Sequence, residues 1–242
     1  MEAGLAILIV LTLGLAGAAG VLSPRATERE QNETAAENDS TKASQENENK
    51  TSASNPDTEE TQETIADGQY PIMGSSNITV QEMVDYFNAS GEVYPAEELS
   101  EGGADSIETF CQMYYDEATA EGVRPEVAFA QTMKETGFLQ YGGDASIEQF
   151  NFAGLGTTGN GVPGNSYPDV QTGIRAQIQH LKAYATADAL NQECVDDRYE
   201  YVKKGSAPYV QWLGQQENPE GLGWATGDNY GYDIVGMIEE MM

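Results

Sequence analysis

The chain has 242 residues, and its 40 acidic against 11 basic residues give a formal net charge of −29. So large an excess of acid excludes the basic patch that binding of nucleic acid or of an anionic membrane surface requires. Two cysteines and one histidine are too few for a disulfide-rich scaffold or a four-thiolate zinc site, and we expect neither metal nor cofactor. Residues 1–67 carry −9 and residues 68–242 carry −20, which favours a soluble monomer.

The first 22 residues contain an uncharged, largely apolar run from Ala3 to Leu22. Its length suits a membrane-spanning helix, whereas Ala16-Gly-Ala18 has the small-x-small pattern of a signal-peptidase site. Glu2 stands where a signal peptide usually carries a basic residue. Residues 1–22 are therefore expected to be a signal peptide or an N-terminal membrane anchor. Either alternative places the rest of the chain outside the cytoplasm, secreted or anchored at the cell surface.

Residues 23–69 are predicted to form a disordered acidic spacer. They are rich in Ser, Thr, Asn and Glu and have too few large apolar residues to offset the entropy of ordering. On random-coil scaling their ends lie about 35–40 Å apart, which suits a tether for a following domain.

Residues 70–242 are predicted to form one mainly helical domain. Thr79-Val-Gln-Glu82 is a capping-box pattern that opens a helix reaching about Asn88. Further helices are expected. One is capped by Asp105 or Ser106, has apolar residues at helical spacing from Ile107 to Ala118 and stops at Gly122. The others run over about Pro125–Thr136, Asp169–Leu181, Pro208–Leu213 and Tyr230–Glu240.

Residues 142–164 contain seven glycines and show no helical periodicity. This composition predicts a loop or a β-hairpin, and the whole pattern predicts an α+β fold with a small Gly-rich β lobe. The literal G-x-G-x-x-G at Gly154–Gly159 does not indicate a dinucleotide site, because no helix can follow at Pro163. Cys111 and Cys194 could pair, or Cys111 could be a buried free thiol, and His180 is expected to be a packing or surface residue.

Glu135 is the residue whose local setting suggests chemistry. It lies in the last turn of the predicted helix 125–136, where the negative end of the helix dipole and apolar neighbours both disfavour a second negative charge. We therefore expect a raised pKa, which a general acid needs in order to hold a proton near neutral pH. An ordinary exposed glutamate, paired with Lys134 or hydrated by solvent, is the alternative.

Four segments then occur in a characteristic order: 130–138 (AQTMKETGF), 151–156 (NFAGLG), 167–181 (YPDVQTGIRAQIQHL) and 224–235 (WATGDNYGYDIV). Together they resemble the glucosaminidase domain of bacterial autolysins, glycoside hydrolase family 73. The resemblance covers about residues 107–238 and implies a lysozyme-like fold, with a helical lobe, a small β lobe and a cleft. It also implies cleavage of the β-1,4 bond after N-acetylglucosamine in peptidoglycan.

The resemblance implies roles for single residues. Glu135 corresponds to the general acid and Tyr230 to the tyrosine beside it, while Asn151, Phe152 and Gly154 correspond to the segment that shapes the cleft floor. Of the aromatic residues, Tyr230 and then Phe152 are expected to stack on sugars.

The family's proposed second glutamate has no counterpart, because residues 149–168 contain no Asp or Glu. Asp169 is the candidate for a second catalytic carboxylate, although it could equally cap its helix. Glu148 and Asp228 are counted among the substrate-binding candidates. Participation of the substrate's own 2-acetamido group is the alternative to a second carboxylate.

The sequence thus predicts an exported peptidoglycan hydrolase of the endo-β-N-acetylglucosaminidase type. A lytic transglycosylase with a single catalytic glutamate is one alternative. A glycan-binding domain without turnover is the other.

Overall fold

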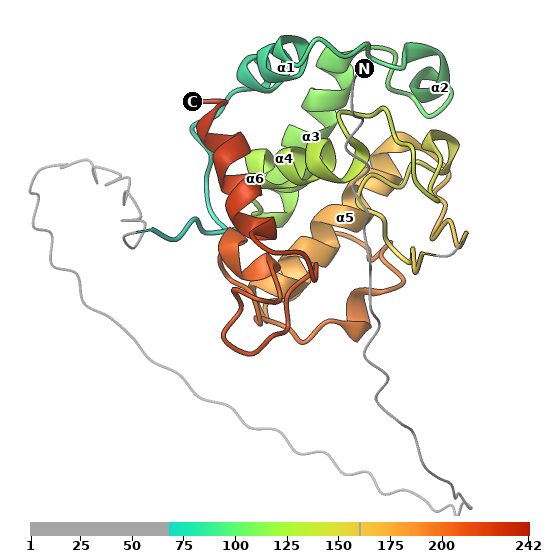
Figure 1. The fold of residues 1–242 in the computed structure, drawn as a ribbon. Helices are drawn as coiled ribbons and strands as arrows, with labels where there is room; N and C mark the ends of the chain where they lie inside the picture. Colours follow the sequence, from blue (N-terminus) through green and yellow to red (C-terminus); the bar gives the residue numbers. More distant parts are fainter. Residues whose placement is uncertain (1–67, 160) are drawn as a thin grey trace, which may run out of the picture. The chain divides into compact units, whose positions relative to one another are not determined.

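The computed structural model describes residues 68–159 and 161–242 (Figure 1). The predicted signal peptide or anchor at residues 1–22, and the predicted spacer as far as residue 67, lie outside this range. None of the helices described between residues 68 and 242 has the length and apolar character needed to cross a membrane.

The described residues form a mainly helical domain, as predicted. The α-helices are α1 (Val80–Ala89), α2 (Ala96–Ser100), α3 (Ile107–Glu121), α4 (Pro125–Thr136), α5 (Val170–Ala185) and α6 (Tyr230–Glu239). Three short 3₁₀ helices lie between them: η1 (Ile147–Gln149), η2 (Tyr199–Tyr201) and η3 (Val210–Leu213). The short helices α2, η1 and η2 were not predicted from the sequence.

The helix ends follow the local capping signals. Thr79 and Glu82 form the predicted capping box of α1, and the side chain of Ser106 caps α3. Gly122 ends α3 in the left-handed conformation (φ +76°), which glycine adopts without steric penalty. The side chain of Asp169 accepts a hydrogen bond from the Thr172 N–H and so caps α5.

Helix α4 is the central element of the core. It packs against α3 on one side and α6 on another, and α3 in turn packs against α1 and α5. Every residue of α4 from Pro125 to Met133 is buried, so this helix is enclosed on all sides (Figure 1). The largest fully buried aromatic residues are Phe87, Phe110, Tyr114, Phe129 and Phe152.

The predicted β lobe is not formed as a sheet. The segment around residues 142–164 has η1, turns and one isolated bridge between Gly159 and Val162, and the described residues contain no longer strand. Five glycines between residues 154 and 164 have positive φ, at 154, 156, 159, 161 and 164. Since a strand requires negative φ, these glycines form successive turns in place of a hairpin ladder.

Two glutamates of α3 are buried and hold the segment that follows α5. Glu121 accepts hydrogen bonds from Lys182 (2.8 Å) and from the backbone N–H groups of Asn191 (2.8 Å) and Gln192 (3.0 Å). One turn earlier, Glu117 accepts two hydrogen bonds from Arg175, both at 2.8 Å. Glu121 therefore supplies acceptors for two backbone N–H groups of this segment, and Glu117 holds it through the side chain of Gln192.

Cys194 is exposed and Cys111 is buried, and both of these described cysteines are free thiols.

Replacing Glu121 with Gln should destabilise the domain by about 3–5 kcal/mol, because it leaves buried Lys182 without a countercharge. Urea denaturation of the two proteins measures the difference. Glu220→Gln is the matched control: its partner Lys203 is 60% exposed, so this change should leave the midpoint nearly unchanged. Equal effects of the two substitutions would contradict the assignment of Glu121 as a buried structural carboxylate.

Candidate active site

Glu135 lies in the last turn of α4, at the edge of the buried core. Gly137 ends the helix in the left-handed conformation, with φ +58°. The residue is only partly accessible to solvent, whereas its neighbours Met133 and Thr136 are buried. The carboxyl group is thus presented at the margin of the core by an enclosed helix.

Tyr230, the first residue of α6, meets Glu135 from the opposite side. Its hydroxyl group donates a hydrogen bond to Oε1 of Glu135 across 95 residues of sequence. Helices α4 and α6 pack against each other, so the two groups are brought together by tertiary structure. The structure therefore places the predicted acid and the predicted tyrosine in direct contact.

Two buried glutamines fix the direction of that hydrogen bond. Nε2 of Gln131 donates to the Tyr230 hydroxyl oxygen (3.0 Å), while its Oε1 accepts from Nε2 of Gln177 (3.0 Å). Oε1 of Gln177 accepts in turn from the hydroxyl groups of Tyr114 (2.7 Å) and Thr132 (2.9 Å). Since Tyr230 receives a donor from Gln131, its single proton is directed to Glu135.

These glutamines were missed in the sequence. Gln131 lies four residues before Glu135, and this spacing places both side chains on one helix face. That spacing was the available signal, although it does not reveal a partner on α6.

Burial raises the pKa of Glu135 to about 7, while the hydrogen bond from Tyr230 and the positive charge of Lys134 partly counteract the rise. The direction and the role of burial agree with the sequence expectation. Burial and the neighbouring Glu135 also raise the pKa of Tyr230 well above its ordinary value, so the phenol stays protonated and remains a donor. At neutral pH the carboxyl group is therefore divided between its protonated and ionised forms.

Lys134 does not pair with Glu135, in contrast to the alternative considered from the sequence. Its Nζ contacts Oδ2 of Asp233 at 2.7 Å and lies 5.6 Å from the centre of the Tyr230 ring. Lys134 thus links α4 to α6 beside the Glu135–Tyr230 contact, while the carboxyl group of Glu135 accepts its hydrogen bond from Tyr230.

The backbone after Glu135 is unusual. Phe138, Leu139 and Tyr141 have φ of +55°, +64° and +57°, a region that non-glycine residues rarely occupy. The N–H of Tyr141 bonds the Thr136 carbonyl oxygen (2.7 Å), and the N–H of Leu139 bonds the Thr136 hydroxyl group (2.9 Å). These bonds hold the chain in a strained turn directly after the acid.

The residues predicted to form the cleft floor make contacts within the domain. The buried side chain of Asn151 bonds both the N–H and the carbonyl oxygen of Leu155, and it also bonds the Asn165 carbonyl oxygen. Gly154 takes φ +61° in the same turn. Phe152 is fully buried against Phe110, with ring centres 5.1 Å apart, so the expectation that it stacks on a sugar is wrong for this conformation.

The predicted carboxylates are dispersed. Asp169 caps α5 as described above, and Glu148 is exposed and accepts a hydrogen bond from the Ser146 hydroxyl group. Asp228 is exposed in the turn before α6. The hydrogen bonds of Asp169 and Glu148 thus go to their own neighbours in sequence.

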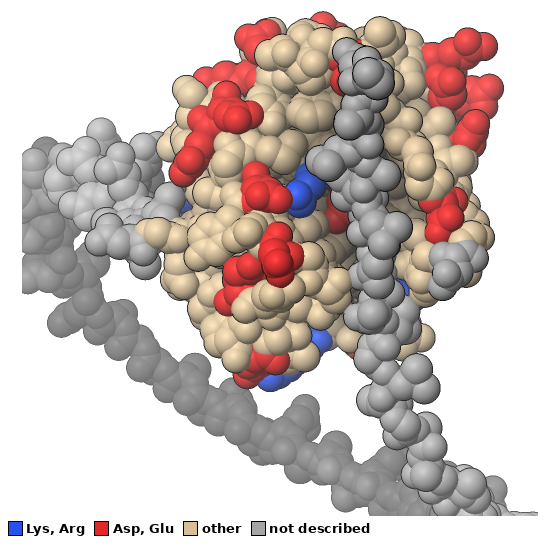
Figure 2. Space-filling view, viewed as in Figure 1, with Lys and Arg blue, Asp and Glu red and all other residues tan. Residues whose placement is uncertain are grey.

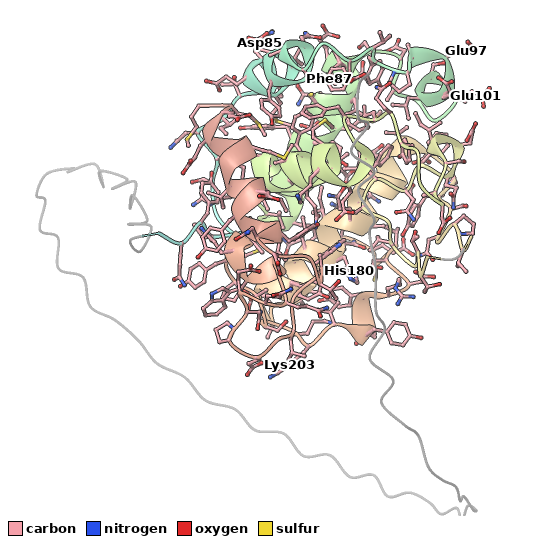
Figure 3. All side chains as sticks on the ribbon, in the orientation of Figure 1. Asp85, Phe87, Glu97, Glu101, His180 and Lys203 are labelled. Atoms are coloured by element: carbon pink, nitrogen blue, oxygen red, sulfur yellow. The ribbon has the colours of Figure 1, made fainter. Side chains whose placement is uncertain are left out.

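His180 is a packing residue, as expected. It lies on α5 (Figure 3), its Nδ1 is 2.7 Å from Oδ2 of buried Asp196, and its ring packs edge-on against Trp224. Within residues 68–242, apart from residue 160, no group of three His, Cys, Asp or Glu side chains is placed to hold a metal ion.

Comparison with known families agrees with this geometry. The family model named Glucosaminidase, described as mannosyl-glycoprotein endo-β-N-acetylglucosaminidase, matches residues 111–242. The chain belongs to this glucosaminidase family. Membership confirms the resemblance noted in the sequence, accords with the mainly helical, lysozyme-like domain, and at family level supports a glycosidase related to peptidoglycan.

Among curated proteins, an "Uncharacterized protein" of Borreliella burgdorferi is similar. It is 44% identical over 104 residues, which make up 43% of this chain and 51% of that protein. The chain thus spans about half the length of the curated relative that it matches. No solved structure matches the chain.

Replacing Glu135 with Gln should raise the stability of the domain at alkaline pH. Since the pKa of Glu135 is raised from 4.5 to about 7, the stability that its protonated form contributes is fully present below pH 4.5. That contribution is lost as the pH rises through 7, whereas glutamine cannot ionise. The melting temperature of Glu135→Gln relative to wild type should therefore be higher at pH 8 than at pH 4.5.

The control for this comparison is Glu97→Gln, on the exposed outer side of α2 (Figure 3). Its difference from wild type should be much the same at both pH values. If the advantage of Glu135→Gln were equally independent of pH, burial of an ionisable Glu135 would be disproved.

Proposed function

We propose that residues 70–242 form a peptidoglycan hydrolase that cleaves the β-1,4 bond after N-acetylglucosamine, with Glu135 as its general acid. The observation that carries the proposal is the contact between Glu135 and Tyr230, in a chain that belongs to the glucosaminidase family. A carboxyl group with a pKa of about 7 can hold a proton at neutral pH and can also release it.

In the proposed reaction, Glu135 gives its proton to the glycosidic oxygen as the bond from that oxygen to C1 of N-acetylglucosamine breaks. The leaving sugar departs as an alcohol, and positive charge develops at C1 in an oxocarbenium-like transition state. The Tyr230 hydroxyl group stabilises the carboxylate that remains, because its hydrogen bond favours the ionised form. Tyr230 is therefore proposed to support the acid, and sugar stacking is not needed for this role.

The substrate's own 2-acetamido group is proposed to stabilise C1. Residues 149–168 supply no carboxylate, Glu148 is exposed and bonded to Ser146, and Asp169 caps α5. Attack of the acetamido oxygen on C1 forms a cyclic oxazolinium ion. Water then opens this ion at C1, and the carboxylate of Glu135 takes the proton that the water loses.

The site of action follows from the proposed substrate. Peptidoglycan lies outside the cytoplasmic membrane, so we infer that the domain acts there. The apolar run at residues 3–22 supports delivery across the membrane, as a cleaved signal peptide or as an anchor.

Purified cell walls incubated with the full chain should release new reducing ends of N-acetylglucosamine. Glu135→Gln should lower the rate by at least about 100-fold, the usual contribution of a general acid. The rate of the wild type should fall as the pH rises through about 7, because ionised Glu135 has no proton to donate. Glu97→Gln should match wild type throughout.

Product analysis by mass spectrometry separates the alternatives. Anhydro-muramyl ends would identify a lytic transglycosylase and contradict the proposed hydrolysis. Binding to walls with no released product would identify a glycan-binding domain. A Glu135→Gln variant as active as wild type would remove Glu135 from the mechanism.

Added salt should increase activity on walls that carry anionic polymers. Residues 68–242 contain 27 acidic and 7 basic residues, and acidic side chains are scattered over the face shown in Figure 2, with few basic ones. Salt at about 0.1 M shortens the range of repulsion between exposed charges to about 10 Å. The rate should therefore rise as salt or divalent cations are added from a low concentration.

The matched control is wall material from which the anionic polymers have been removed. Its hydrolysis should depend much less on salt. If the rate of hydrolysis of both materials decreases steadily as salt is added from the lowest concentration, the repulsion hypothesis is wrong.

A further inference from the structure

The start of α6 sets the position of Tyr230, and its own capping residue does not hold it. Asn229 precedes the helix in the left-handed conformation (φ +60°), and within the described residues its side chain makes no capping hydrogen bond. The N–H groups at a helix start have no partners within the helix. The position of Tyr230, the first helical residue, therefore depends on how firmly the preceding turn is held.

Glu217 holds the residue that precedes α6. Its Oε1 accepts a hydrogen bond from the Asn229 N–H at 2.8 Å, from a turn 12 residues earlier in the chain. A carboxylate beside a helix N-terminus is also favoured by the helix dipole. Glu217 therefore anchors the backbone of the residue before α6 from a distant position in the sequence, whereas Asp169 caps α5 by accepting from the Thr172 N–H inside that helix.

The surrounding glycines are fitted to this arrangement. A Cβ atom added to Gly214 would lie 2.0 Å from Oε2 of Glu217, although the φ of Gly214 is an ordinary −76°. A Cβ atom on Gly231, in the first turn of α6, would lie 2.1 Å from the Val210 carbonyl oxygen. Gly214 thus makes room for Glu217, and Gly231 lets α6 lie directly on η3.

The second carboxylate oxygen adds an unusual feature. Oε2 of Glu217 is buried and has no hydrogen-bond partner among the described residues. An unpaired buried carboxylate oxygen costs free energy, so stability alone does not account for this residue. The other oxygen, Oε1, accepts from the residue next to Tyr230.

We propose that Glu217 is a positioning residue: by binding the Asn229 N–H, it fixes the first turn of α6 and so holds the Tyr230 hydroxyl group against Glu135. The route runs from Glu217 to Asn229, to Tyr230 and then to Glu135. Hydrogen bonds weaken steeply with distance and misalignment, so a small shift of this turn weakens the last contact. The proposal rests on the proposed function only in assigning the acid role to Glu135.

The test is the pKa of Glu135 in the full chain, measured by carbon NMR of labelled glutamate carboxyl groups. The groups that act on Glu135 are Tyr230 and Lys134, and Asp233 holds Lys134 in place. The hydrogen bond from Tyr230 lowers this pKa, so Tyr230→Phe should raise it above its wild-type value of about 7. Glu217→Ala should raise it in the same direction, and adding Glu217→Ala to Tyr230→Phe should raise it no further.

Two matched variants separate positioning from general damage. Gly214→Ala keeps the carboxylate but displaces it, and should raise the pKa of Glu135 as Glu217→Ala does. Glu217→Gln keeps an acceptor oxygen for the Asn229 N–H, and should leave the pKa near that of wild type. Glu220→Ala, in the same turn but exposed and paired with Lys203, should also leave it unchanged.

On cell walls, Glu217→Ala should lower kcat about tenfold and leave KM nearly unchanged, because the supporting hydrogen bond acts mainly on the acid. If folded Glu217→Ala and Gly214→Ala keep the Glu135 pKa of wild type while Tyr230→Phe changes it, the positioning role is wrong. If Glu217→Ala does not fold, Gly214→Ala decides by the same measurement. If Glu217→Ala and Gly214→Ala raise the pKa of Glu135 but the wild type does not cleave cell walls, the positioning role of Glu217 is supported. Only the proposed function is then overturned.

Discussion

The hydrogen bond between Tyr230 and Glu135 is the contact on which the candidate site depends. Burial deprives a carboxyl group of hydration and raises its pKa, and one well-directed donor restores part of what water would give. The balance leaves Glu135 near neutrality, where both of its protonation states are accessible. A fully solvated carboxyl group would be ionised at this pH, and one buried without a donor would hold its proton too firmly.

The helical core keeps both ends of that contact in place. Helix α4 is enclosed by the rest of the core. Gln131 and Gln177 hydrogen-bond each other, and they also bond the Ala128 carbonyl oxygen and nearby hydroxyl groups. A fully satisfied polar network fixes the register between helices more strictly than apolar packing, because each donor must meet its acceptor. The same helices that form the core therefore also set the direction of the Tyr230 proton.

What the sequence could predict was local. The caps at Thr79, Ser106 and Asp169 depend on residues within three or four positions, and these ends agree with the structure. The raised pKa of Glu135 follows from its place in an apolar helix, which the sequence pattern shows. The family could be recognised because four such segments occur in order.

What the sequence could not predict depends on contacts between distant segments. Gln177 resembles any polar helix residue until α4 and α5 are packed together, and Glu217 resembles a surface carboxylate until α6 lies on η3. Phe152 was expected at the floor of a cleft, but its ring packs against Phe110 in the core. Glycines between residues 154 and 164 indicated turns, and their positive φ values decided against strands.

The buried ion pairs of α3 and α5 have a consequence for the outer surface of the domain. Lys182 is 3% exposed and pairs with buried Glu121, so its positive charge neutralises an interior carboxylate and contributes little outside. Such a pair removes one cation and one anion from the surface, so the surface keeps the net charge of the domain but shows fewer cations. A polyanion that approaches this surface is therefore repelled by acidic side chains, with little local attraction from basic ones.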